Sequence, residues 1–222
     1  NQPGGKLSVI DEGAALAAMR FAKNLVVRPP GPGETWLRAL QKLEGPLAFT
    51  SAGLGVEFCE AGRLVRKDGL WQLAVCDTHE MVGGVHCAEF TLQRMSIVES
   101  VCVGLVRSSL SPIADWLPAH QSTDAWMFGA YSGALWHGGG SREWAGLLAG
   151  PNVVQQGDRI GLVLDLVRGT LSVYLNGRQL GVMVNSPELC SCAPVCWAAD
   201  VSRGAAVRIE GKDPPCLQVG AR

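Results

Sequence analysis

Short apolar or alternating stretches, separated by glycine-containing turns, make up most of the chain. From Leu47 onward such stretches cover residues 70–76, 86–92, 98–106, 160–166, 170–175 and 180–184. Each has the length of a strand and is too short for an ordinary helix. We expect one hairpin, Leu164–Leu175, to turn at 167–169 and a second to turn at Asn176-Gly177, a dipeptide that strongly signals a two-residue hairpin. Many short strands without long intervening helices predict a β-sandwich or a β-barrel.

Residues 1–45 follow a different pattern. Residues 12–21 are rich in alanine and are predicted to form a short helix. After a proline- and glycine-rich break, residues 36–43 place four apolar side chains on one side of a second short helix. We therefore expect a short N-terminal helical extension that packs on a β-domain spanning 46–212, with 213–222 as a tail.

Composition and charge narrow the classes of partner. The 222 residues are 47% hydrophobic, have a formal net charge of −1 and contain no long run of either sign. This balance argues against a nucleic-acid or anionic-membrane surface. No apolar stretch approaches the roughly 18 residues that a membrane span needs. The composition therefore predicts a soluble protein that binds neither nucleic acid nor membrane.

Eight cysteines are present, and several lie inside apolar runs, as in Val101-Cys102-Val103. Such thiols pack as small hydrophobic groups, and the start of the chain has no secretory pattern, so we expect reduced thiols and a cytoplasmic location. Cys190, Cys192 and Cys196 could supply half of a zinc site, but a closed site needs four ligands and no paired spacing provides the fourth. We expect no disulfide, no structural metal and no cofactor.

One stretch carries a specific signature. Residues 157–166 read Gly-Asp-Arg-Ile-Gly-Leu-Val-Leu-Asp-Leu, residues 168–177 read Arg-Gly-Thr-Leu-Ser-Val-Tyr-Leu-Asn-Gly, and Leu180-Gly181-Val182 follows. This closely resembles the core motif of the SPRY domain family, here at residues 157–184. Further segments, among them Val103-Gly104-Leu105-Val106, fall in the family's order, so that the resemblance covers about residues 47–212.

The resemblance implies an all-β fold, a concanavalin-like two-sheet antiparallel β-sandwich. One position departs from the family's pattern, since Cys87-Ala88 stands where the family has an aromatic pair. We expect Trp71 or Trp144 to fill the core there. The resemblance also implies a non-catalytic module that binds other proteins.

Catalytic interpretations have weaker support. His137-Gly138-Gly139-Gly140 imitates the oxyanion-hole motif of α/β-hydrolases, but no G-x-S-x-G nucleophile elbow follows it. Asp158 and Asp165 could be interpreted as a catalytic pair of carboxylates. Both flank turns, however, where aspartate accepts hydrogen bonds from backbone amides. We therefore expect no enzymatic activity.

The loops at the end of a sandwich are the expected place for function, because a rigid frame positions them. We expect loops 77–84, 108–124 and 200–204, at one end of the sandwich, to form a shallow patch for a protein or peptide partner. Their side chains mix apolar bulk with hydrogen-bonding groups, as interfaces do. The predicted contact residues are Thr78, His79, Met81, Trp116, His120 and Arg203.

The sequence leaves alternatives for the role of Trp116 and for the class of ligand. Trp116 is either an interface anchor or a strut that folds its own loop back onto the sandwich. A carbohydrate-binding, lectin-type domain is the alternative to an adaptor-type interaction module. Such a lectin commonly needs calcium held by clustered oxygens, and Asp115 and Asp124 flank the long loop without an adjacent asparagine. We expect a monomer, and the sequence does not identify its partner.

Overall fold

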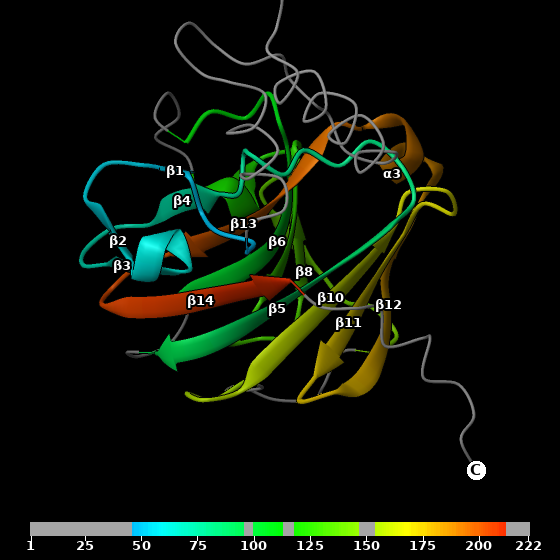
Figure 1. Cartoon of the computed structure of the whole chain (residues 1–222). Coiled ribbons are helices and arrows are strands. Elements are labelled where there is room, and N and C mark those ends of the chain that lie inside the picture. Colours follow the sequence, from blue (N-terminus) through cyan, green and yellow to red (C-terminus); the bar gives the residue numbers. More distant parts are fainter. Residues whose placement is uncertain (1–45, 96–99, 113–117, 147–153, 212–222) are drawn as a thin grey trace, which may run out of the picture.

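The computed structural model describes residues 46–95, 100–112, 118–146 and 154–211. These residues form two antiparallel sheets of seven strands each, packed face to face (Figure 1). The predicted all-β, two-sheet sandwich is therefore confirmed. The predicted N-terminal helical extension and the predicted tail lie outside the described residues.

The first sheet, here called sheet A, has the strand order β1-β4-β13-β6-β7-β8-β9. Its strands in chain order are β1 (Ser51–Ala52), β4 (Gln72–Val75), β6 (Val101–Arg107), β7 (Ala125–Gly129), β8 (Leu135–His137), β9 (Gly140–Arg142) and β13 (Val195–Val201). The adjacent strands β6 and β13 are buried on both faces for almost their whole length. Burial on both faces explains why these two segments are continuous apolar runs.

The second sheet, sheet B, has the order β12-β11-β10-β5-β14-β3-β2. Its strands are β2 (Val56–Cys59), β3 (Leu64–Lys67), β5 (Val85–Arg94), β10 (Arg159–Asp165), β11 (Thr170–Leu175), β12 (Arg178–Asn185) and β14 (Ala205–Gly211). Within the described residues, three short helices connect strands: η1 (Glu60–Gly62), η2 (Ala119–Gln121) and α3 (Pro187–Ser191). Burial alternates along β10, so this sheet presents one face to the core.

Both predicted hairpins are present. Strands β10 and β11 pair with Asp165 opposite Thr170, and Asp165 Oδ1 accepts hydrogen bonds from the backbone N–H groups of Val167 and Arg168, each at 3.0 Å. This carboxylate thus closes the turn. In the next turn Asn176 and Gly177 have φ values of 51° and 82°, the positive angles that a type I′ hairpin requires.

The main core lies between the two sheets. Phe90 of β5 meets Trp197 of β13 edge-on, with 6.3 Å between ring centroids. Trp144 packs against this core and meets Phe128 at 6.5 Å. Trp71, the other candidate for filling this core, packs elsewhere, because it belongs to a second cluster.

That second apolar cluster lies on the outer face of sheet A. Its buried members are Leu73, Val75, Cys102, Val106, Ala119, Ala125, Met127, Cys196 and Ala198, with Trp71, Leu110 and Trp136 packed against them. Leu110 and Ala119 belong to the long connection between β6 and β7, so the described parts of this connection pack on the outer face of the sheet. These parts of the predicted binding loop therefore cover the sheet.

Candidate functional site

Strand β13 separates two ends of the sandwich. The end where β13 begins at Val195 and β6 ends at Arg107 is here called the α3 end. The end where β13 leads through residues 202–204 into β14 is called the Arg203 end. Seven residues of extended chain hold the two ends about 20 Å apart.

The predicted single patch is divided between these ends, which corrects the expectation from the sequence. Met81 forms an isolated bridge with Val195, so loop 77–84 lies at the α3 end. Arg203 follows the other end of the same strand. The long connection 108–124 starts and finishes at the α3 end, where Arg107 N donates to Asp124 O, and its His120 contacts Asp200 near the other end of β13.

Three predicted contact residues lie at the α3 end. Thr78 and His79 are half-buried, with 3.1 Å between Thr78 Oγ1 and His79 Nδ1. Met81 is only 1% exposed and exchanges two backbone hydrogen bonds with Val195. Met81 is therefore a core residue and not a surface contact, because pairing with β13 turns its side chain inward.

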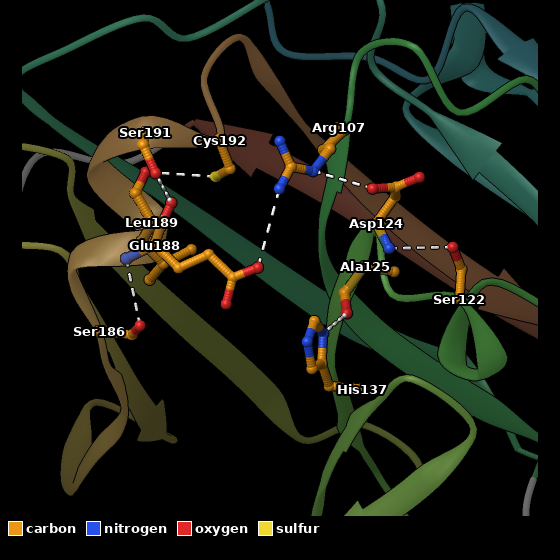
Figure 2. Close-up of polar contacts among 10 residues, drawn as sticks. All are labelled: Arg107, Ser122, Asp124, Ala125, His137, Ser186, Glu188, Leu189, Ser191 and Cys192. Atoms are coloured by element: carbon orange, nitrogen blue, oxygen red, sulfur yellow. Dashed lines mark hydrogen bonds and ion pairs between the residues drawn. The ribbon is translucent and has the colours of Figure 1, made fainter.

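At the α3 end, Arg107 forms ion pairs with two acidic side chains (Figure 2). The Arg107 guanidinium lies 2.9 Å from Asp124 and 3.8 Å from Glu188 of helix α3, and it stands over the Trp126 ring at 5.8 Å. His137 stacks on the same Trp126 ring, with 5.1 Å between ring centroids. The candidate calcium ligand Asp124 is thus engaged by arginine, and Asp115 lies outside the described residues.

The three clustered cysteines do not converge. Cys190 is exposed, whereas Cys192 belongs to the core between the sheets and Cys196 to the cluster on the outer face of sheet A. Burial raises the pKa of the Cys192 thiol, which favours its protonated form. Within the described residues no group of three or more His, Cys, Asp or Glu side chains is arranged to hold a metal, and the seven cysteines there are free thiols.

His86 carries a pH-dependent contribution to stability at the α3 end. Its Nε2 lies 2.7 Å from Gly83 O, and burial lowers the pKa of the imidazole although that hydrogen bond opposes the shift. The unfolded chain takes up the proton first as pH falls, so we expect stability to decline below pH ~6.5 and to level off below the folded-state pKa. Denaturant titrations between pH 7 and pH 5 should show a smaller decline for His86→Gln, which keeps a donor without titrating. Parallel curves for the two proteins would contradict this assignment.

His120 is the predicted contact residue whose position differs most from expectation. It is buried, and its Nδ1 lies 2.8 Å from Asp200 Oδ2, which also accepts from the His120 backbone N–H at 3.3 Å. The edges of Trp71 and Trp136 flank the imidazole, with centroids 4.8 and 5.3 Å away. His120 therefore fastens the long connection to β13. Trp116 lies outside the described residues, so its role as anchor or strut stays a prediction.

Asp200 belongs to a buried polar group that sequence reasoning missed. Asp200 Oδ1, Ser100 Oγ and Ser202 Oγ are buried and have no hydrogen-bond partner among the described residues. Register places all three side chains on the outer face of sheet A, since Asp200 pairs with Cys102 and Ser202 N donates to Ser100 O. The sequence does contain one indication of this buried polar group, because Asp200 is the only charged residue in the apolar run 195–201.

Two leucines at the Arg203 end were also missed. Leu54, between β1 and β2, is 88% exposed, and Leu70, between β3 and β4, is 84% exposed. Because β1 pairs with β4 and β2 pairs with β3, the turns that carry Leu54 and Leu70 lie at the same end of the sandwich. At these exposures neither leucine is covered by the other described residues, so both are available to a partner.

The turn that carries Arg203 adjoins Leu70. Arg203 is exposed with φ 52°, and its backbone N–H donates to Gly69 O at 2.8 Å, while Gly204 N donates to Lys67 O at 2.8 Å. Gly53 N donates to Leu73 O at 2.8 Å, which joins the β1–β2 turn to the same group. Backbone hydrogen bonds thus connect the Arg203 turn to the β3–β4 turn, and the β1–β2 turn to strand β4. Among the described residues no helix is long and apolar enough to cross a membrane.

Comparison with known proteins agrees with this geometry. The human HERC1 SPRY domain is similar, with a TM-score of 0.59, 22% identity and coverage of 73% of this chain and 96% of that one. Another human SPRY domain has a TM-score of 0.52, 18% identity and coverage of 72% and 97%. The TRIM65 PSpry domain has a TM-score of 0.56, 15% identity and coverage of 94% and 98%. A comparison with curated proteins finds no match.

At these identities the structural neighbours show the fold alone, and the family follows from the sequence. The sequence model of the SPRY domain family matches residues 89–213, more than half of the chain. That interval contains the Asn176-Gly177 hairpin and the strand β13 that separates the two ends. The chain therefore belongs to the SPRY domain family.

Proposed function

We propose that this chain is a non-catalytic interaction module that holds a protein or peptide partner at the Arg203 end of its sandwich. SPRY domains are protein-interaction modules and generally have no catalytic activity. The observation that carries the choice of site is the high exposure of two leucines, Leu54 and Leu70, in turns at the same end as the exposed Arg203. Large apolar side chains within a polar rim are the usual composition of an interface.

The α3 end supports such a site less well. Its exposed apolar side chains are valines, with Val167 76% exposed at the tip of the β10–β11 turn. Arg107 is committed to Asp124 and Glu188, and Asp77 is hydrogen-bonded to Thr50 Oγ1. A partner that used these charges would first have to break existing contacts. At the Arg203 end, by contrast, the leucines can be covered without loss of an internal contact.

The same proposal extends to location and assembly. Cys76 is fully buried, and burial raises the pKa of its thiol, which suits a reduced thiol in the cytoplasm. We propose a cytoplasmic, adaptor-type module that acts as a monomer and binds through one face. Nucleic acid and membrane are not proposed as partners, because the net charge is close to zero.

Replacing both leucines tests the site. In Leu54→Ser/Leu70→Ser, partner binding should weaken by about 2 kcal/mol or more, because apolar anchors near the centre of an interface dominate its energy. Stability should change by less than about 1 kcal/mol, since both side chains are exposed. The measurement is quantitative affinity purification with the full chain, followed by calorimetry with each purified partner.

Val167→Ser is the matched control, since it removes an exposed aliphatic side chain from a turn at the opposite end. It should retain the partners of the unmodified protein. If the leucine variant retains the same partners with the same affinity, the Arg203 end is not the binding site. If Val167→Ser loses them instead, the site lies at the α3 end.

A further inference from the structure

Three buried oxygen atoms lie beneath the turn that carries Arg203. We infer that one buried water molecule bridges the Asp200 carboxylate to the hydroxyl groups of Ser100 and Ser202. The site lies inside the fold, beside His120 on the outer face of sheet A, so it does not depend on which partner the module binds. The burial, the register and the chemistry of the three side chains carry this inference.

All three side chains are withdrawn from solvent. Asp200 is fully buried, and Ser100 and Ser202 are each 1% exposed. Asp200 Oδ1 and the two serine Oγ atoms have no hydrogen-bond partner among the described residues. Leaving a buried polar group without a partner is costly, and nearly all such groups in native proteins bond to protein or to ordered water. Three such groups on one face of one sheet therefore require a common partner.

The register of sheet A places the three oxygens around one position. Ser202 N donates to Ser100 O at 3.0 Å, which sets the two serines opposite each other just beyond the β13–β6 ladder. Asp200 lies two residues from Ser202, so its side chain is on the same face of the strand. Opposite residues have Cβ atoms about 5 Å apart, and residues two apart on one strand about 7 Å. Side chains as short as these do not bond to one another here, but one small molecule can lie between them.

The chemistry of the three groups favours water over a cation. A carboxylate oxygen only accepts hydrogen bonds, whereas a serine hydroxyl can also donate one. A water molecule can accept from both hydroxyls and donate to Asp200 Oδ1, and about three bonds are usual for a buried water. Asp200 Oδ2 is already engaged by His120, so one carboxylate oxygen and two hydroxyls remain for a ligand. Calcium takes about six to eight oxygen ligands, more than this group supplies.

The sign of a serine substitution tests the inference in solution. If nothing bridges the three groups, Ser202→Ala removes a hydroxyl without a partner, and the melting temperature should stay equal or rise. With the water bound, the same substitution removes one of its hydrogen bonds, and the melting temperature should fall by about 2–4 °C. Ser100→Ala should behave in the same way. Ser141→Ala is the matched control, because Ser141 is an exposed serine in strand β9 of the same sheet, and it should leave the melting temperature unchanged.

A high-resolution crystal structure of the unmodified full chain observes the molecule directly and needs no variant. A density peak should lie about 2.6–3.2 Å from Asp200 Oδ1 and from the Oγ atoms of Ser100 and Ser202. The peak should be absent from Ser100→Ala/Ser202→Ala. No peak in the unmodified protein, a protein donor on Asp200 Oδ1, or a ligand about 2.3–2.6 Å from six or more oxygens, as for calcium, would overturn the inference. An equal or higher melting temperature in both single serine variants would overturn it as well.

Discussion

Replacing His120 with alanine is expected to lower the free energy of unfolding by about 3–5 kcal/mol. The imidazole is the side chain that serves Asp200 Oδ2, at 2.8 Å, and Asp200 is fully buried. Without it the carboxylate keeps one backbone hydrogen bond, at 3.3 Å, while Oδ1 already lacks a partner among the described residues. Chemical denaturation followed by tryptophan fluorescence measures the loss.

A second substitution distinguishes an unpaired charge from a simple cavity. In His120→Ala/Asp200→Asn the carboxylate becomes neutral, so the double variant should be more stable than His120→Ala alone. His79→Ala is the control, because this histidine is only half-buried and its Nδ1 lies 3.1 Å from the Thr78 hydroxyl. A loss below about 1 kcal/mol for His120→Ala, or a double variant less stable than the single one, would contradict the assigned role.

Local signals explain why the fold could be predicted. Asn176-Gly177 specifies its own turn, and Asp165 closes the preceding turn with amides two and three residues ahead. The alternation of buried and more exposed side chains along β10 indicates which of them face the core. None of these inferences requires knowledge of which strands become neighbours. The central sandwich therefore follows from short stretches of sequence.

The candidate site depends on contacts between distant residues, and here sequence reasoning was partly wrong. Met81 was expected at the surface, but it pairs with Val195, more than a hundred residues away. His120 was expected in an exposed loop, but its partner Asp200 lies 80 residues on. Whether two loops share an end is fixed by strand order and direction, which the residues of the loops themselves do not encode.

The leucines at the Arg203 end illustrate the remaining gap. Both Leu54 and Leu70 stand next to glycine, and apolar residues at turn tips could have been noticed from the sequence. Their location at one end of the sandwich could not, because it follows from the pairing of β1 with β4 and of β2 with β3.

The second large effect is expected for Gly104→Ala, which should destabilise the protein by about 3 kcal/mol. Gly104 lies in the middle of β6, between Ala198 of β13 and Met127 of β7. A Cβ built there would lie 2.0 Å from Trp126 O and 2.9 Å from the Met127 Cα, and both contacts are backbone atoms. Relief therefore requires strand β7 to move, which a side-chain rotation cannot provide.

Gly140→Ala is the matched control for this effect. Gly140 also lies in a strand of sheet A, at the start of β9, but a Cβ built there meets nothing within 4 Å. Its unfolding free energy should stay within about 0.5 kcal/mol of the unmodified protein. Equal denaturation midpoints for the two variants would show that β7 yields without cost. A large loss confined to Gly104→Ala would explain glycine at this position by the close approach of two backbones.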